Sequence, residues 1–359
     1  MRAMERKRWR IFHRIRFPIL VHFSFPLVVI ALAISVLAFP SPSSARVPPS
    51  TSLLSSGSRL VSSLSMLRAS ERSEDPPPSL KLVACGDLML RSVPNGALDE
   101  VQPLFQEADY RVGNLECVLS QRGTPAPQKP YIFRDSGGLA WLQAADIDLV
   151  SLANNHSWDY QWEGLLDSFQ ALDRAGIQTV GFADPSHSPF LSVEKEGIRI
   201  AFLAFAEVDL VWWPFWFQGE VGIPLIETSP MVEAVQKAKA AGVDHVVVFL
   251  HWGEEGSTQA LASQTALAHR LVDAGASLIL GSHSHTCQGV ETYRGAVIAY
   301  SLGDCLFGDS TSEDCGQLLE VRLEPKGRLE WCKIVGLTMR EGILATTWVR
   351  QLEGRNNPR

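Results

Sequence analysis

The sequence predicts an α/β protein with a largely parallel β-sheet, and three observations lead to this prediction. From residue 81 onward, short apolar runs alternate with segments of helical periodicity, as in chains built from β-α-β units. Each of the three clearest helical segments is followed by glycine, which commonly ends a helix. Hydrophobic residues make up 46% of the 359 residues and charged residues 20%, so a large core is available and disorder of the whole chain is excluded.

The first expected element is a membrane segment. Residues 1–16 are basic and suit a cytoplasmic position, and the 23 residues of 17–39 contain no Lys, Arg, Asp or Glu. As a helix, such a stretch reaches roughly 34 Å, enough to cross a bilayer core of roughly 30 Å. A signal peptide is the alternative, with cleavage near Ser43-Ser44-Ala45. Either way the body lies outside the cytoplasm, in a single-pass cell-membrane protein or a secreted one.

Residues 40–80 are expected to form a disordered linker. The segment is rich in Ser and Pro and ends in Pro76-Pro77-Pro78, so it buries little apolar surface. One folded domain is expected to follow, over residues 81–345.

Within this domain, apolar runs predict seven strands, at residues 81–85, 110–113, 148–152, 198–205, 245–250, 278–280 and 296–300. Helical spacing predicts helices at residues 163–175, 231–241 and 260–274. A hairpin turn is expected at 194–197. Two alternating segments, 317–323 and 329–337, predict a closing antiparallel pair.

Charge and cysteine usage exclude some classes of protein. The net charge is −7, and because residues 1–46 carry eight Lys or Arg and one Glu, a charge of +7, the remainder carries −14. An acidic body lacks the basic surface that nucleic-acid binding requires. The six cysteines show no C-x-x-C spacing, so a zinc ribbon or a thioredoxin motif has no support, and most are expected to be buried free thiols.

Unusual polar residues follow the predicted strands. They are Asp87, Glu116, Asn155, His156, His251, His283 and His285. Since the carboxyl ends of parallel strands line one crevice, these side chains are expected to converge. Carboxylate and imidazole ligands suit Mn, Fe or Zn. The sequence has no serine on a Gly-x-Ser-x-Gly elbow, so a serine nucleophile has no support. The pattern therefore predicts a site for one or two divalent metal ions.

The motifs resemble those of the CapA-type poly-γ-glutamate capsule-synthesis family, a branch of the calcineurin-like metallophosphoesterases. They are Gly86-Asp87-Leu88-Met89, Asn114-Leu115-Glu116, Ala153-Asn154-Asn155-His156-Ser157-x-Asp159, His251-Trp252-Gly253-x-Glu255, Gly281-Ser282-His283-Ser284-His285 and Ser301-Leu302-Gly303-Asp304. The resemblance covers about residues 81–310 and implies two β-sheets packed face to face with helices outside, a four-layer α/β/β/α sandwich.

The resemblance also implies roles. Asp87 and His285 would bind one metal ion. Asn155, His251 and His283 would bind a second, with Glu116 bridging the two.

The resemblance also implies a catalytic pair beside the metal ligands. His156 would be a general acid that faces the substrate, and Asp159 would hold its ring in the correct tautomer. The implied function is a metal-dependent phosphoesterase-like hydrolase of surface-polymer biosynthesis, whose partner is an anionic surface polymer or phosphoester.

Several alternatives stay open. Met89 stands where the wider superfamily has a His ligand, which favours a non-catalytic component of polymer assembly or export. Asp87 could begin a loop and Asn155 could cap a turn. The aromatic run at residues 212–217 could be a binding patch or a buried plug. The oligomeric state is open.

Overall fold

The computed structural model describes residues 77–90, 93, 96–127, 129, 133–135, 137–182, 190–207, 222–307, 316–340 and 343–352. The predicted membrane segment, most of the predicted linker and the aromatic run at 212–217 lie outside these residues. No helix among the described residues is long and apolar enough to cross a bilayer.

The first sheet has eight strands and is mixed. Its parallel part contains β1 (Leu80–Met89), β2 (Tyr110–Leu115), β3 (Leu149–Ser151), β4 (Gln178–Val180) and the short β11 (Asp304–Phe307), which pairs with β1. The antiparallel part contains β12 (Gly316–Glu324), β13 (Arg328–Arg340) and β14 (Ile343–Leu352). The order is β14-β13-β12-β1-β2-β3-β4.

The second sheet has six strands in the order β5-β6-β7-β8-β10-β9. Its four central strands, β6 (Ile198–Ala206), β7 (His245–His251), β8 (Leu278–Ser282) and β10 (Ala296–Ala299), are parallel. The two edge strands, β5 (Leu191–Lys195) and β9 (Val290–Tyr293), are antiparallel to their neighbours.

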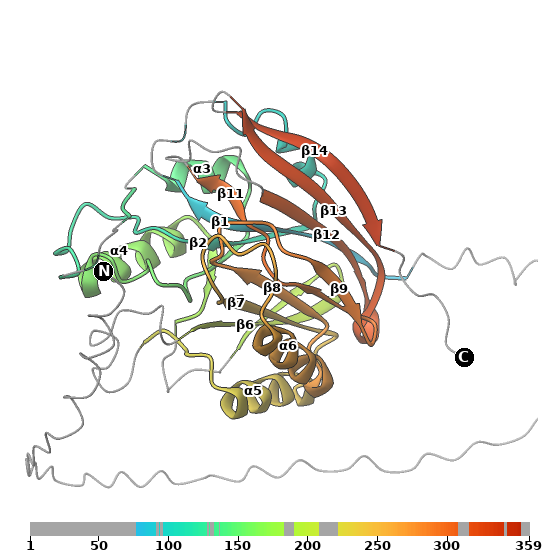
Figure 1. Ribbon diagram of the computed structural model, residues 1–359. Helices are drawn as coiled ribbons and strands as arrows, with labels where there is room; N and C mark the ends of the chain where they lie inside the picture. Colours follow the sequence, from blue (N-terminus) through green and yellow to red (C-terminus); the bar gives the residue numbers. More distant parts are fainter. Residues whose placement is uncertain are drawn as a thin grey trace, which may run out of the picture. The chain divides into compact units, whose positions relative to one another are not determined.

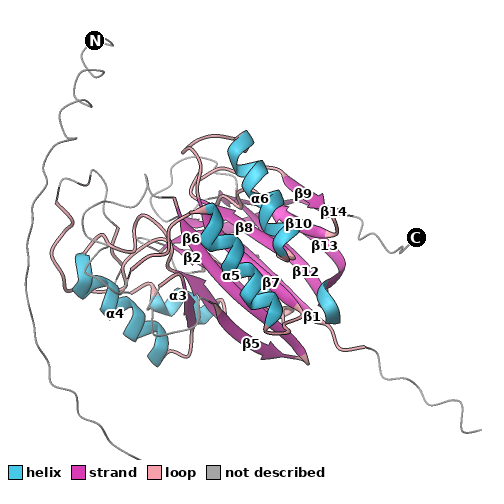
Figure 2. Cartoon of the chain, turned by 90° about the horizontal axis from the view of Figure 1, so that it is seen from below, coloured by secondary structure: helices cyan, strands magenta, loops and turns pink. Residues whose placement is uncertain are grey.

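The sheets pack face to face around one core cluster, which contains Leu82, Phe202 and Leu319. A second cluster covers the outer face of the eight-stranded sheet under α2 (Gln102–Gln106), α3 (Leu139–Ala144) and α4 (Gln161–Arg174). A third lies under α5 (Thr228–Ala240) and α6 (Ala262–Ala274), on the outer face of the other sheet. Figures 1 and 2 show these helices outside the two sheets, so the fold has four layers, α/β/β/α, as the resemblance implied.

Most of the predicted elements are confirmed. All seven predicted strands and all three predicted helices are present, and β12 and β13 form the closing antiparallel pair. Glu196 and Gly197 have positive φ at the predicted hairpin turn. The division into two separate sheets of eight and six strands was implied only by the resemblance, and the third antiparallel strand, β14, was not predicted.

Cysteine chemistry agrees with the prediction for most positions. The free and buried cysteines are Cys85, Cys117, Cys305 and Cys332. Cys287 is disulfide-bonded.

Candidate metal centre

The candidate ligands come from strand ends of both sheets. Register places Asp87 on β1 opposite Asn114 on β2 and Asp304 on β11. In the other sheet, His251 ends β7 opposite Ser282, the last residue of β8. The parallel strands thus deliver their carboxyl ends to one edge, where the sequence predicted a crevice.

A glycine allows the backbone to close on this edge. A Cβ atom on Gly86 would lie 1.8 Å from the carbonyl oxygen of Gly303, which no side chain could accept. The next residue, Asp87, donates its N–H to that same oxygen at 2.8 Å. The close contact therefore fixes Asp87 beside Asp304 at the start of β11.

Asp87 is fully buried and held at both carboxylate oxygens. Oδ1 accepts a hydrogen bond from Asn114 Nδ2 at 2.8 Å, and Oδ2 accepts one from the backbone N–H of His283 at 3.0 Å. Asn114 Oδ1 in turn accepts from Asn154 Nδ2 at 3.1 Å. Burial raises the pKa of Asp87. Asp87 is therefore a built part of the site and not the start of a loop.

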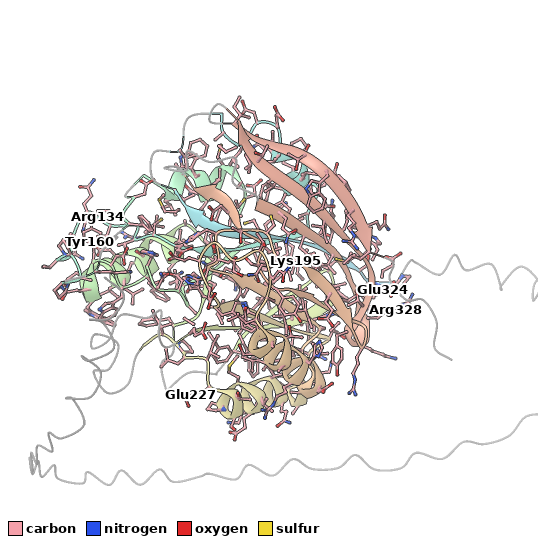
Figure 3. The ribbon with its side chains drawn as sticks, viewed as in Figure 1. Arg134, Tyr160, Lys195, Glu227, Glu324 and Arg328 are labelled. Atoms are coloured by element: carbon pink, nitrogen blue, oxygen red, sulfur yellow. The ribbon has the colours of Figure 1, made fainter. Side chains whose placement is uncertain are left out.

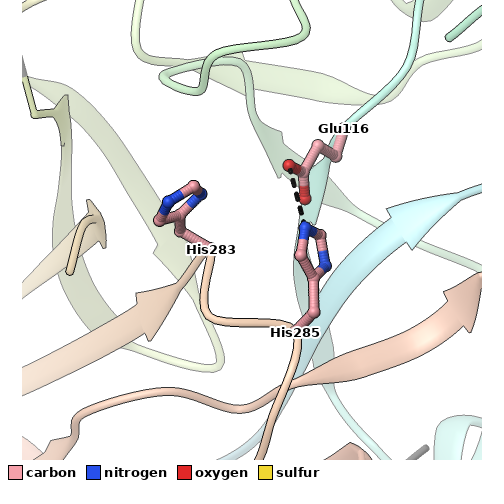
Figure 4. Close-up of side chains that lie close together, drawn as sticks. All are labelled: Glu116, His283 and His285. Atoms are coloured by element: carbon pink, nitrogen blue, oxygen red, sulfur yellow. Dashed lines mark ion pairs between the residues drawn. The ribbon is translucent and has the colours of Figure 1, made fainter. Parts of the chain in front are cut away.

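Glu116 is 0% exposed, yet neither of its carboxylate oxygens accepts a hydrogen bond from a described residue. Its Oε1 lies 3.6 Å from His251 Nε2 and 3.9 Å from His285 Nε2, the second of these pairs being drawn in Figure 4. Burial and the nearby Asp87 carboxylate raise the pKa of Glu116 well above its usual range. A buried carboxylate without donors is costly unless a cation compensates it.

Two histidines face this carboxylate as neutral rings. His251 Nε2 lies 2.8 Å from Asn155 Oδ1 and its Nδ1 lies 3.0 Å from Ser282 Oγ. His283, whose ring centroid is 4.8 Å from that of His251, has no hydrogen-bond partner at Nδ1 among the described residues. Burial lowers the pKa of His251 far below its usual range and that of His283 to about 3. Neutral imidazole is the form that binds metal.

His285 differs because it lies among carboxylates. Its Nδ1 is 2.9 Å from Asp304 Oδ1 and 3.8 Å from Asp87 Oδ2. Burial alone lowers the pKa of His285, but Glu116, Asp304 and Asp87 outweigh it and raise the pKa to about 10. The backbones of His283 and His285 both have positive φ, which turns the two rings in different directions toward the site.

Ligand atoms of these residues gather in three overlapping groups, each within 4.8 Å. The groups are Glu116 with His283 and His285, Asp87 with Glu116 and His251, and Asp87 with His285 and Asp304. The buried oxygens of Glu116 and the free Nδ1 of His283 are orphaned polar atoms that a cation would satisfy. The donor set of imidazole, carboxylate and amide fits Mn, Fe or Zn.

Asn155 does not cap a turn, because its neighbour takes that role. Asn154 Oδ1 accepts from the backbone N–H groups of His156 and Ser157 at 3.0 and 2.9 Å. The amide oxygen of Asn155 instead lies 2.8 Å from His251 Nε2, so Asn155 stays a candidate ligand.

His156 and Asp159 are arranged as predicted. His156 Nδ1 lies 2.7 Å from Asp159 Oδ2, and the ring packs against Phe133 with 4.2 Å between centroids. Asp159 Oδ2 also accepts the Phe133 N–H at 2.5 Å. Burial lowers the pKa of His156.

Three residues at this site, Lys129, Asn114 and Asp304, were not among the predicted site residues. Lys129 Nζ donates to the Asn155 carbonyl at 2.5 Å, contacts Asp159 Oδ1 and lies 3.2 Å from His156 Nδ1. No spacing pattern marks a single loop lysine. Asn114 and Asp304 both belong to the motifs of the resemblance, and their amide and carboxylate groups could have marked them as site residues.

Met89, at the position of the expected histidine, is fully buried in the outer core cluster. It therefore supplies no ligand to this site. Asp304 adds a carboxylate on the same side of the centre, beside Asp87 and His285.

Comparison with known proteins gives consistent matches. The family model described as "Bacterial capsule synthesis protein PGA_cap" matches residues 81–309. The capsule biosynthesis protein CapA of Bacillus anthracis is 29% identical over 254 residues, which cover 67% of this chain and 61% of that protein. A probable polyglutamine synthesis accessory protein of Mycobacterium tuberculosis (strain ATCC 25618 / H37Rv) is 34% identical over 206 residues, 53% of each chain. The chain thus spans between about half and three fifths of these relatives' lengths.

Solved structures show looser likeness. The calcineurin-like phosphoesterase YfkN from Bacillus subtilis has a TM-score of 0.46 at 15% identity, covering 77% of this chain and 90% of its own. A hypothetical protein from Thermus thermophilus has a TM-score of 0.44 at 17% identity, covering 76% of this chain and 98% of its own.

Proposed function

The chain belongs to the bacterial capsule synthesis protein family PGA_cap, and from this premise we propose that it is an extracytoplasmic, metal-dependent, phosphoesterase-like hydrolase. Its proposed role is in the biosynthesis of poly-γ-glutamate or another surface polymer, with an anionic polymer or a phosphoester as substrate. The membrane segment at residues 17–39, or its cleavage as a signal peptide, would place the domain outside the cytoplasm.

The observation that carries the proposal is the state of Glu116. A fully buried carboxyl group that accepts no hydrogen bond from a described residue, with imidazole nitrogens 3.6 and 3.9 Å away, is an arrangement that suits a bound cation. The proposed ligands are Asp87, Glu116, Asn155, His251, His283 and His285, with Asp304 as an added carboxylate. One or two divalent ions bound here would polarise a phosphoryl oxygen and lower the pKa of bound water.

The chain's own residues supply the proton chemistry. His156 follows the ligand Asn155, and its Nδ1 is committed to Asp159, which fixes the ring. Nε2 is therefore the atom that would exchange a proton with the leaving oxygen of the substrate. Phe133 packs against the ring and helps to hold its position.

A second candidate function is a non-catalytic component of polymer assembly or export. The observation in its favour is the burial of Met89, which removes one imidazole from the centre. In this alternative the metal would shape a binding site for an anionic chain and no bond would be broken.

The two candidates are separated by metal content and turnover measured together on the full chain. Metal would be determined by elemental analysis, and turnover with an aryl phosphodiester. We expect His283→Ala to lose metal and activity together. We expect His156→Ala to keep its metal and lose about 10²- to 10⁴-fold in rate, the usual contribution of a general acid.

A histidine outside the centre provides the control. His269 on α6 stacks on Tyr293 and pairs with Glu291, so His269→Ala should keep both metal and rate. If the metal-loaded wild type hydrolyses no phosphoester, the assembly function replaces the catalytic one. If His283→Ala keeps its metal, the proposed centre itself is wrong.

A further inference from the structure

A cavity of about 320 Å³ lies at the edge of the sheets opposite the metal centre. Its lining includes Ser277, which precedes β8, and Ala296, which begins β10. The metal ligands follow the other ends of these parallel strands, since His283 comes directly after β8. The remaining lining comes from α5, the end of α6, the hairpin of β9 and β10, and the strands β13 and β14 with the turn before β13.

The lining is cationic in an otherwise acidic body. It contains Lys239, Arg294, Lys326 and Arg328, and none of the described residues that line it is Asp or Glu. Residues 47–359 carry a net charge of −14, as noted above, so four cations around one cavity are not an average sample of this surface. Such a cavity attracts anions.

The two arginines are held by weak surface pairs. Arg294 Nη1 lies 2.8 Å from Asp273 Oδ1, and Arg328 Nε lies 2.7 Å from Glu324 Oε2. Figure 3 shows Arg328 beside Glu324 where β12 and β13 meet. The arginine side chains are 68% and 60% exposed, so solvent screens both pairs, although Glu324 itself is only 14% exposed. An anion in the cavity can share these guanidinium groups with the carboxylates, because each guanidinium has five N–H donors.

The two lysines are positioned by neutral or backbone contacts. Lys239 Nζ donates to the backbone carbonyl oxygen of Asp244 at 3.1 Å. This acceptor is neutral, so the bond does not neutralise the charge of the lysine. The backbone N–H of Lys326 donates to Asp244 Oδ1 at 2.8 Å, and Lys326 has a φ of 63°. Asp244 thus fixes the turn that presents Lys326 at the cavity.

Apolar side chains complete the lining, among them Val272, Trp331 and Leu352. The mixture suits a ligand that alternates oxyanions with short aliphatic segments. Four cations on separate elements suit several oxyanions better than one, and Arg forks match carboxylate and phosphate alike. The volume is at the small end of ligand pockets, which have about 300 to 1,000 Å³.

We propose that this cationic cavity is a binding site for a short segment of a polycarboxylate chain, separate from the metal centre. The identity of that chain rests on the proposed function in surface-polymer biosynthesis. The cations surround a cavity, and the apolar face of α5, which carries Lys239, is packed in the core and is not free to enter a bilayer, which favours a chain ligand over a membrane surface.

The test measures binding of a fluorescently labelled γ-linked oligoglutamate to the full chain in mild detergent. EDTA is present throughout, so the metal centre and its chemistry take no part. We expect the double variant Lys326→Gln/Arg328→Gln to weaken binding about tenfold, a loss of about 1.4 kcal/mol, because two charge contacts to the ligand are removed. Added salt should weaken wild-type binding as well.

The matched control is Lys237→Gln, which changes an exposed lysine on α5, two positions before Lys239, that does not line the cavity. It should bind within about twofold of wild type. The proposal is overturned if the double variant binds like wild type or if Lys237→Gln loses as much. It is also overturned if only vesicles of anionic lipid, or inorganic phosphate, bind through these residues.

Failure of this proposal and failure of the proposed function are distinguishable. A protein that binds oligoglutamate in EDTA but hydrolyses nothing loses the catalytic proposal and keeps the cavity. A protein that hydrolyses phosphoesters with unaltered oligoglutamate binding in the double variant loses the cavity proposal and keeps the catalytic one.

Discussion

Glu116 is a buried carboxyl group whose charged form needs a neighbouring cation. Its carboxylate has no donor among the described residues, and imidazole nitrogens lie 3.6 and 3.9 Å away. In the metal-free protein burial disfavours the charged form of this residue, and a bound cation would compensate that charge. The same residue thus couples stability to metal binding.

Substitution of Glu116 by Gln should separate these two effects. In EDTA, we expect Glu116→Gln to melt close to the wild-type temperature, because burial already disfavours the charged form of this carboxyl group and Gln is its neutral isostere. On addition of Mn²⁺ or Zn²⁺ the wild type should gain several degrees and the variant less. Thermal unfolding with and without metal measures this. Glu233→Gln on α5, an exposed position, should behave like wild type in both conditions.

Lys129 connects the backbone at Asn155 with His156, the proposed general acid. It contacts the Asn155 carbonyl, His156 Nδ1 and Asp159 Oδ1 together, so its ammonium group is occupied by the protein. It is therefore a positioning residue and not a substrate contact. Its removal leaves Asp159 buried without its counter-charge.

We expect Lys129→Met to lower turnover of the aryl phosphodiester by about tenfold or more, with kcat affected more than KM, while metal content stays near wild type. Lys129→Arg should restore part of the rate, because it restores the cation. Lys195→Met, at an exposed position on β5, serves as the control. Loss of metal in Lys129→Met would show instead that Lys129 supports the ligand Asn155.

At the scale of elements, segments with a clear apolar run or helical period could be predicted, including the short β3 and β10, whereas β4, β9, β11 and β14 were missed. Strands such as β6 and β7 are continuous apolar runs, and α4 to α6 end before glycine or alanine-glycine pairs. By contrast β4, β9 and β11 have three or four residues each, too few for a period to be visible. They exist because a neighbouring strand offers hydrogen bonds, which is tertiary information.

The same division holds at the site. Candidate ligands that directly follow an apolar run could be proposed from position and residue type. Lys129 could not, because it acts through contacts with residues far away in the chain, and the contacts of Asn114 and Asp304 are also of this kind, such as the bond from Asn114 to Asp87 across 27 positions. The backbone contact of Gly86 with Gly303 is of the same kind.

His245 begins β7 and ties three elements together. It is fully buried, its Nε2 lies 2.7 Å from the Glu324 carbonyl oxygen at the end of β12, and its Nδ1 lies 3.1 Å from Ser277 Oγ before β8. Burial lowers the pKa of His245 to about 4, against a partial opposing effect of Asp244. Lys239 is the other charged neighbour and lowers the pKa further.

This shift predicts an acid sensitivity with a defined window. The folded-state pKa lies below the unfolded value of about 6.5, so the unfolded chain binds the extra proton first. Stability attributable to His245 is thus intact above about pH 6.5 and falls as the pH drops toward about 4, by up to roughly 3 kcal/mol. Urea unfolding at neutral pH and near the folded-state pKa should show that His245→Gln loses less stability on acidification than wild type. His269→Gln, at a partly exposed ring, should lose as much as wild type.

For the whole molecule, the two candidate sites occupy opposite edges of the sheets, and the domain begins at the edge of the cationic cavity. Leu80, the first residue of β1, pairs with Leu323 near the turn that presents Lys326, and Arg322 donates to Ser79 Oγ at 2.8 Å. A chain anchored at its N-terminus would therefore enter the domain beside the cavity, with the metal centre at the far edge.

That arrangement depends on the predicted anchor and linker, and it can be tested on cells. If residues 17–39 span the membrane and residues 40–80 are an unstructured linker, protease added outside the cytoplasmic membrane should cut only in the linker. The released fragment should begin between about residue 41 and residue 80, since backbone within β1 is paired on both sides and resists cleavage. The remaining N-terminal piece should stay with the membrane at high salt and high pH, because an apolar span of this length is held by the bilayer core. N-terminal sequencing of both products is the measurement. A mature protein that starts near residue 46 without protease would establish signal cleavage. An intact chain protected from protease would place the domain in the cytoplasm and remove the extracytoplasmic part of the proposal.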